Sequence, residues 1–284
     1  MVPLTVRVLH RTYRPILRRA AFHALEGRQR EDLPPSRWLP ADVDAFLTDV
    51  WSMVDQLLPV ADLARLPSFG TRHNAFLALV TTAAYRVLLD RGLAAPHARE
   101  LVSDMGWKVY RWMLTTALLP FRALRLTPEQ RMKGTLRLLL RFPFEASKRP
   151  AYEARAWSDG AAMHTIFTHC PPLEVVRRIV SSTGDRGDLK AFRSSWCQYD
   201  WAAADLIAGD GSTGHYERPH TLSNGDPVCD MRWSFEPLVP LRRSRNARVE
   251  DRASAPQNGD DVVVSADDRG ERIDDWTCVG APDD

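Results

Sequence analysis

The sequence predicts an α+β fold, in which a helical N-terminal region packs with a four-stranded antiparallel sheet of β-β-α-α-β-β order. Apolar residues recur at the helical period over residues 11–142, and two hairpin patterns flank two helices over residues 152–235. Helices on one face of the sheet are the economical packing for this order of elements. Beyond Pro240, arginine-rich and then acidic stretches with few apolar residues predict a disordered tail. The predicted regions are 1–145 (helical), 146–240 (α+β) and 241–284 (tail).

Composition narrows the classes of function. The chain has 284 residues, 44% of them hydrophobic, and a formal net charge of +2. Such a small charge argues against a nucleic-acid-binding protein, whose affinity depends on a basic surface. The apolar run over residues 113–119 is too short to span a membrane, so we expect no membrane partner. Arginine and histidine interrupt the first 19 residues, so we expect no secretory signal, a cytoplasmic location and four free thiols.

The N-terminal region is predicted to be helical because its apolar residues lie three or four positions apart, on one face of each segment. The strongest start signal combines Thr127 at the cap, Pro128 at the first helical position and Gln130 at the third. Gly92 ends an earlier helix. Helices are expected over about 40–54, 71–89, 96–119 and 127–142.

The period then changes to that of a β-hairpin, with strands over residues 152–157 and 161–169 and a turn at 158–160. Side chains alternate between the two faces of a strand, so a face assignment follows directly. One face of the second strand is predicted to hold Met163, Thr165, Phe167 and His169, and the other His164, Ile166, Thr168 and Cys170.

Two helices and a second hairpin complete the α+β region. The first helix is predicted over 171–184, and the second runs without a break over about 188–208. Asn224-Gly225 is a strong signal for a two-residue hairpin turn, which would join strands over 215–222 and 228–235.

The residues with the clearest chemical potential lie between the second helix and the second hairpin. Cys197 and Asp200 are three positions apart, which places both on one half-buried flank of the predicted helix. Strand alternation directs Cys229 toward the core and Asp230 away from it. Each cysteine has an alternative interpretation as an ordinary small core residue. A half-buried carboxylate is costly without a partner or a task, so Asp200 favours a chemical site.

Two further residues each have a functional and a structural interpretation. Cys170 precedes Pro171 at a strand-to-helix junction, where a helix N-terminus can lower the pKa of a thiol. The alternative is a buried thiol at a tight corner. Arg218 can hold a substrate carboxylate through two parallel hydrogen bonds, or it can form an exposed cross-strand pair with Glu217 or Asp226.

These residues also carry a family resemblance. They are Cys170-Pro171, Cys197 with Asp200, Arg218, Thr221-Leu222, Gly225-Asp226, Cys229-Asp230 and Arg232. In this order they resemble the L-2-amino-thiazoline-4-carboxylic acid hydrolase family. The similarity covers roughly residues 70–236, and its specific part is 160–235. An aromatic residue often follows the Cys-acidic pair in that family, whereas Met231 follows it here and Trp233 lies further on.

The resemblance implies a hydrolase that opens a small cyclic amidine or thiazoline carboxylic acid. Water adds at the carbon between sulfur and nitrogen, the C–S bond breaks, and an N-carbamoyl thiol amino acid results. The chemistry needs a base for water or a covalent thiol, and a group that holds the carboxylate. We assign Cys197 as nucleophile or metal ligand, Asp200 as base or orienting group, and Cys229 as second thiol or ligand. Arg218, Thr221 and Asp230 are assigned to substrate binding, with Arg218 at the carboxylate.

Two other classes of function stay open. The β-β-α-α-β-β pattern also resembles 4-vinyl-reductase-type domains, which implies a non-catalytic module that binds a small molecule or a metal. Cys170, Cys197 and Cys229 with one His or Asp would supply four tetrahedral ligands to a divalent metal. In the third reading the helical half and the charged tail form the partner surface of an accessory factor. The expected partner is a small-molecule substrate, and a homo-oligomer is compatible with the sequence.

Overall fold

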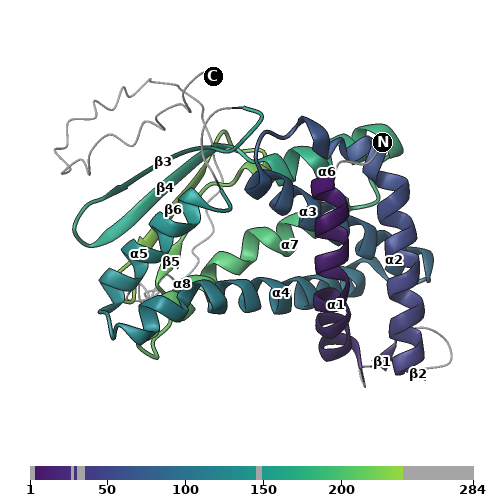
Figure 1. The fold of residues 1–284 in the computed structure, drawn as a ribbon, viewed down its shortest axis with the longest axis horizontal. Helices are drawn as coiled ribbons and strands as arrows, with labels where there is room; N and C mark the ends of the chain where they lie inside the picture. Colours follow the sequence, from purple (N-terminus) through teal and green to yellow (C-terminus); the bar gives the residue numbers. More distant parts are fainter. Residues whose placement is uncertain (1–3, 27–28, 31–35, 145–148, 239–284) are drawn as a thin grey trace, which may run out of the picture.

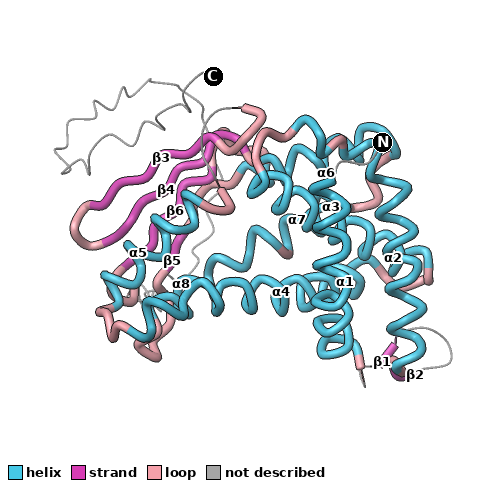
Figure 2. The backbone as a smooth tube through the Cα atoms, in the orientation of Figure 1, coloured by secondary structure: helices cyan, strands magenta, loops and turns pink. Residues whose placement is uncertain are grey.

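The computed structural model describes residues 4–26, 29–30, 36–144 and 149–238 (Figure 1). It is a mixed fold, with a helical bundle on one side and a four-stranded antiparallel sheet, accompanied by further helices, on the other (Figure 2). This arrangement confirms the predicted α+β class. In the described part of the chain, no helix is both long and apolar enough to cross a membrane. The predicted tail, 241–284, lies outside the described residues.

The helices that precede the sheet follow the predicted pattern and extend beyond it. The capping box is present, because the Thr127 hydroxyl accepts the Gln130 N–H and the Gln130 side chain accepts the Thr127 N–H. A short ladder of β1 (Gln29–Arg30) and β2 (Ser36–Arg37) lies between the first two helices, and the 3-10 turn η1 (Leu63–Arg65) follows the second. The helices are α1 (Leu4–Leu25), α2 (Pro40–Ala61), α3 (Phe69–Asp90), α4 (Ala95–Ala123) and α5 (Pro128–Arg141).

The sheet has the strand order β3-β4-β6-β5, with every neighbouring pair antiparallel. Its strands are β3 (Glu153–Ser158), β4 (Ala162–His169), β5 (Tyr216–Glu217) and β6 (Cys229–Ser234). The predicted second hairpin is wrong in detail, because β5 has only two residues and the 3-10 turn η3 (Leu222–Asn224) replaces the Asn-Gly turn. Pro219 has no N–H that could form a ladder hydrogen bond. After it, the N–H of His220 donates to the carboxylate of Asp230 and the N–H of Thr221 donates to that of Asp226.

The continuous helix predicted over 188–208 is also wrong. The chain forms α6 (Pro171–Thr183), α7 (Asp188–Ser194), the 3-10 turn η2 (Trp196–Gln198) and α8 (Tyr199–Ala208). The helix breaks at Ser195, whose hydroxyl bonds the carbonyls of Ala191 and Phe192. The break turns the indole of Trp196 toward α3, where it donates a hydrogen bond of 2.9 Å to Thr81.

Hydrophobic packing joins the two predicted regions. One cluster of buried residues combines α1 to α4 with Val175, Ile179 and Ala191 from α6 and α7. Another combines α4 and α5 with α8 and the sheet. Helix α4 contributes to both clusters and runs from the helical bundle to the edge of the sheet (Figure 1). The regions 1–145 and 146–240 therefore share their cores.

The crossing of α4 and α8 gives a prediction about stability. A Cβ atom at Gly106 would overlap the hydroxyl of Tyr199, which is fixed by a 2.7 Å hydrogen bond to the carbonyl of Ser103. We expect Gly106→Ala to lower the free energy of unfolding by about 1–3 kcal/mol, because overpacking outweighs the better helix propensity of alanine. Urea unfolding measures this loss. In a Tyr199→Phe background the same substitution should cost less, and a stabilising Gly106→Ala would contradict the prediction.

Candidate functional site

A cavity of about 470 Å³ lies between the helices and the sheet. Its volume is within the range of small-molecule sites, about 300–1,000 Å³. Most of its wall is aliphatic or aromatic, contributed by α4, α5, β4 and β6. The polar residues on the wall are His73, Asn74, Thr116, Thr165, Asp200 and Arg218, together with three cysteines and three tyrosines. A few polar groups in a mostly apolar cavity are typical of a site that orients a small organic ligand.

The predicted chemical residues meet in this cavity although they come from separate elements. Cys170 caps α6, Cys197 lies in η2, Asp200 is in the first turn of α8, Arg218 follows β5, and Cys229 begins β6. The inward direction of Cys229 is confirmed. These residues are brought together by the interruption of the helix at Ser195 and by the strand order, which places β6 between β4 and β5.

The predicted face of Cys170 is wrong. The sequence places it with His164, whereas in the structure Cys170 lines the cavity together with Thr165 and Phe167. Alternation ends at His169, the last residue of β4, where the chain turns into α6. His169 does not lie on the cavity wall, and its ring bonds the carbonyl of Ala151 at 2.6 Å.

An ion pair between Arg218 and Asp200 is the electrostatic centre of the site. Nη1 of Arg218 lies 3.2 Å from Oδ2 of Asp200, and only 4% of the Arg218 side chain is exposed. The Tyr216 hydroxyl donates to the same carboxylate oxygen at 3.2 Å, and Nη2 of Arg218 donates to the Cys197 carbonyl. The guanidinium also lies 4.9 Å from the centre of the Trp201 ring. These contacts fix the Arg218 guanidinium in one orientation beside the cavity.

Of the two interpretations of Arg218, the exposed cross-strand pair is wrong. Glu217 pairs with Arg232 at 3.0 Å, on the outside of the sheet. The Asp226 carboxylate accepts the N–H of Thr221 at 2.7 Å. These two carboxylates are close to Arg218 in the sequence, whereas the packing of α8 against β5 places the carboxylate of Asp200 beside the Arg218 guanidinium.

Asp200 is suited to proton transfer. Its side chain is 20% exposed, and Asp200 is part of the cavity wall. Burial raises the pKa of the Asp200 carboxyl above its ordinary value, and this effect exceeds the opposing influence of Arg218 and Tyr216. A carboxyl group with a raised pKa that faces a cavity is a candidate general acid or base.

The Cys170 and Cys197 thiols are protonated at neutral pH. Burial raises the pKa of Cys197 to about 11, although the Ser223 hydroxyl and Arg218 oppose the shift. Burial also raises the pKa of Cys170, because the N–H of Leu173 offsets only part of the desolvation. Of the two interpretations of Cys170, this favours the buried thiol at a tight corner. The Cys229 sulfur accepts the N–H of Leu222 at 3.2 Å. The free protein therefore does not present Cys197 as a thiolate.

The cysteines do not form a metal-binding cluster. No group of three or more His, Cys, Asp or Glu residues with suitable geometry is found among the residues that the structure describes. Cys170, Cys197 and Cys229 share the cavity wall without converging as ligands of one ion. The described residues offer no preformed set of metal ligands, so the divalent metal stays a prediction and we derive no step through one.

The other two predicted substrate-binding residues differ in position. The Thr221 hydroxyl lies 3.4 Å from the Cys229 sulfur, at the back of the cavity wall. Asp230 points away from the cavity, where it accepts the backbone N–H of His220 at 2.9 Å and pairs with the His220 ring at 3.0 Å. Asp230 therefore cannot contact a ligand in the cavity.

Sequence reasoning missed a second group of polar residues on the cavity wall. His73 and Asn74 lie in α3, a helix for which only apolar residues were expected to matter, and Tyr152 precedes β3. Tyr13 of α1 completes the group. No local pattern marks them, because they come from three distant segments.

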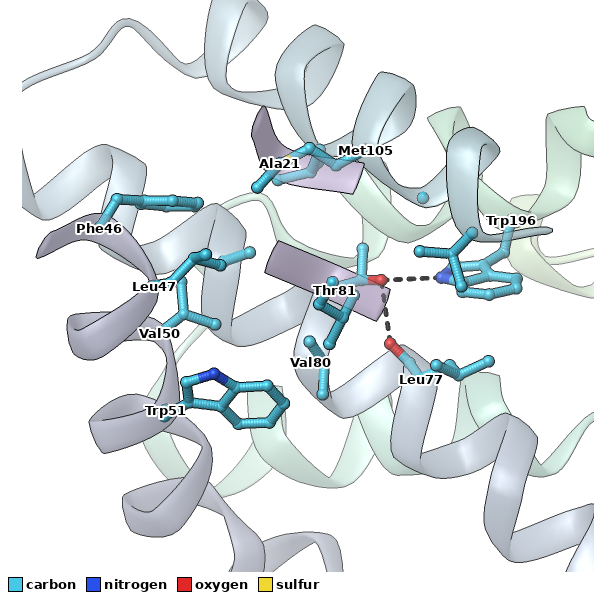
Figure 3. Close-up of a pocket in the computed structure, with 15 residues that line it drawn as sticks. Ala21, Phe46, Leu47, Val50, Trp51, Leu77, Val80, Thr81, Met105 and Trp196 are labelled. Carbon is cyan, nitrogen blue, oxygen red and sulfur yellow. Dashed lines mark hydrogen bonds between the residues drawn. The ribbon is translucent and has the colours of Figure 1, made fainter. Parts of the chain in front are cut away.

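A smaller cavity of about 40 Å³ lies within the helical bundle (Figure 3). Its wall is made of aliphatic and aromatic side chains from α1 to α4, with Thr81 as a polar member. Trp196 lines both cavities, and its indole N–H points to the Thr81 hydroxyl (Figure 3). A space that holds about one water and offers so few polar partners is a packing defect rather than a ligand site.

In comparisons with known proteins, no family model, no curated protein and no solved structure matches the chain. The fold and cavity define the class only coarsely, as an α+β protein with an internal apolar cavity and a buried ion pair.

Proposed function

We propose that the cavity binds a small cyclic carboxylic acid and that the protein hydrolyses its ring, as the resemblance to the thiazoline-carboxylic acid hydrolases implies. The observation that carries the proposal is the buried Arg218–Asp200 pair on an otherwise apolar wall. Arg218 donates to Asp200 and to the Cys197 carbonyl, and its remaining N–H groups are available to a ligand carboxylate. Arg218 is therefore the residue that holds the acid.

Asp200 is the general base in this proposal. It takes a proton from water as the oxygen attacks the carbon between sulfur and nitrogen, and passes that proton to the ring nitrogen. The hydroxyl proton of the adduct then moves through Asp200 to the departing sulfur, so that a carbonyl forms as the C–S bond breaks. A ligand carboxylate beside Asp200 adds repulsion to burial, which moves its pKa further toward the neutral range where a general base works best.

Water rather than Cys197 is the nucleophile, because the thiol is protonated in the free protein. Cys197 and Cys229 instead form the polarisable part of the wall, against which the sulfur of the substrate packs.

The test is thiol release from L-2-amino-thiazoline-4-carboxylate as a function of pH. We expect kcat/KM of the wild type to fall as the pH decreases through the raised pKa of Asp200, because the protonated carboxyl cannot accept a proton from water. Asp200→Asn should lower the rate by about 100-fold or more. Glu217→Gln, which changes an exposed carboxylate two residues before Pro219, is the matched control and should leave the rate unchanged.

A non-catalytic binding module is the second candidate, favoured by the largely apolar wall and the protonated thiols. Wild-type protein that binds carboxylic acids in the cavity but releases no thiol would support it over the hydrolase. A wild-type rate that survives in Asp200→Asn would contradict the assigned base.

A further inference from the structure

The cavity has a second polar wall, remote in sequence from Arg218 and Asp200. Tyr13 hydrogen-bonds to Nε2 of His73, Nδ1 of His73 lies 3.0 Å from Oδ1 of Asn74, and Nδ2 of Asn74 donates to the Tyr152 hydroxyl at 2.9 Å. All four residues line the cavity, and only 3% of Tyr152 is exposed. The chain of hydrogen bonds connects α1, α3 and the segment before β3.

The hydrogen bonds from Tyr13 to Tyr152 have a defined donor and acceptor at each step. Burial lowers the pKa of His73, so the imidazole is neutral and carries one proton. With that proton on Nδ1, His73 donates to Asn74 and accepts from Tyr13, while the amide of Asn74 donates to Tyr152. The oxygen of Tyr152 is thus occupied as an acceptor, and its own O–H meets no acceptor in the described part of the protein.

A second tyrosine on the cavity wall also has a hydroxyl group without an acceptor in the described part of the chain. Tyr110 of α4 also lines the cavity, and its hydroxyl makes no hydrogen bond with any described residue. Burial raises the pKa of Tyr110 and of Tyr152, which keeps both hydroxyls protonated. The residues that the structure describes supply no acceptor to either O–H group, so a ligand that brings an acceptor gains a hydrogen bond there.

The two polar walls belong to opposite edges of the sheet. Tyr152 directly precedes β3 and Arg218 directly follows β5, and the strand order β3-β4-β6-β5 puts two strands between them. Three inter-strand spacings correspond to roughly 14 Å between the backbones, and the side chains approach one another more closely across the cavity, where the charge of Asp200 contributes to the raised pKa of Tyr152. The wall between them is apolar and aromatic, with Phe167, Met231 and Trp233 among its residues.

We propose that the wall at Tyr152 is a second binding subsite, which takes a carbonyl oxygen on an apolar extension of the acid held by Arg218. The inference rests on the proposed function for its carboxylate end. It narrows the ligand class to elongated, largely apolar or aromatic acids that carry a remote ketone, ester or amide oxygen. A bare thiazoline carboxylate would leave this part of the cavity unfilled.

Two matched acids test the subsite. 6-Acetyl-2-naphthoate carries the carbonyl oxygen, and 6-isopropenyl-2-naphthoate has a methylene group in its place with nearly the same shape. We expect the wild type to bind the acetyl acid about 5-fold more tightly, which corresponds to one neutral hydrogen bond. In Tyr152→Phe the preference should vanish, because the acetyl acid weakens to the affinity of the isopropenyl acid. Isothermal titration calorimetry measures both dissociation constants.

Control variants separate a local effect from a loss of structure. Tyr85→Phe changes a tyrosine that donates to the carbonyl of Arg186 outside the cavity, and it should leave the preference at about 5-fold. Asn74→Leu removes the group that orients Tyr152 and should reduce the preference while the Tyr152 hydroxyl is still present.

The outcomes distinguish this inference from the proposed function. Equal affinity of the wild type for the two acids, or an equal loss of both in Tyr152→Phe, would overturn the subsite and leave the acid site at Arg218 standing. Failure of the wild type to bind either acid would overturn both.

Discussion

Arg86→Met should lower the free energy of unfolding by about 3–5 kcal/mol, because it leaves the carboxylate of Asp188 buried without a countercharge. Nε and Nη2 of Arg86 donate to the two carboxylate oxygens at 2.9 and 2.8 Å, and the side chains are 5% and 0% exposed. Arg86 also donates to the Thr183 hydroxyl at 2.8 Å and to the Gly184 carbonyl at 3.0 Å. The substitution therefore breaks the polar connection between α3, the end of α6 and α7.

Urea unfolding followed by circular dichroism measures this effect. The double variant Arg86→Met with Asp188→Leu should be more stable than Arg86→Met alone, because it no longer buries an unpaired charge. Arg91→Met is the control, since the Asp49 partner of Arg91 is largely exposed and the pair is expected to contribute less than about 1 kcal/mol. A loss below about 1 kcal/mol in Arg86→Met would contradict the prediction.

Arg218→Met should weaken the binding of carboxylic acids by at least about 30-fold, since truncating one member of a buried hydrogen-bonded charge pair costs about 2–5 kcal/mol. The variant removes the only cation that the described cavity wall offers to a carboxylate. It also removes the group that opposes the rise in the pKa of Asp200. We expect Asp200 to stay protonated to higher pH in the variant, which removes the base as well as the anchor.

Titration with 2-naphthoate measures the affinity, and the pH dependence of stability gives an independent readout. A carboxyl group whose pKa is higher in the folded than in the unfolded protein binds more protons when folded, so stability falls as the pH rises between the two values. Arg218→Met should show a steeper fall than the wild type. Arg232→Met, which breaks the exposed pair with Glu217, is the control and should bind 2-naphthoate normally. Full affinity in Arg218→Met would contradict the assignment of the acid site.

The sequence predictions are accurate where local interactions determine the structure, and they fail where contacts between distant segments determine it. Helices α3 to α5 and the first hairpin depend on local periodicity and on caps such as Thr127, and the sequence located them to within a few residues. Helix α2 begins where expected but continues to Ala61, beyond the predicted end near residue 54. The break at Ser195 was missed, because the alternative backbone is stabilised by the contact of Trp196 with Thr81, 115 positions away. The shortened β5 was missed for a similar reason, since carboxylate side chains replace the ladder after Pro219.

The predictions about the candidate site show the same contrast between local and distant interactions. Helical spacing was enough to place Cys197 beside Asp200, and strand alternation was enough to turn Cys229 inward. The partner of Arg218 depended on the packing of α8 against β5, and the role of Asp230 depended on the side of the sheet that it faces. Cys170 joined the site because the chain leaves β4 and enters α6 at that residue.

By itself, the sequence determined the α+β class, the helical periods and the inward direction of Cys197, Asp200 and Cys229, because each is a property of neighbouring residues. The tertiary structure decided the volume of the cavity, the Arg218–Asp200 pair, the raised pKa of Cys197 and the hydrogen-bond chain that ends at Tyr152. These features depend on burial and on contacts between segments that are distant in sequence, since one cavity wall contains both Tyr13 and Trp233. A local sequence pattern cannot predict such contacts, because they arise from the strand order and the packing of the helices.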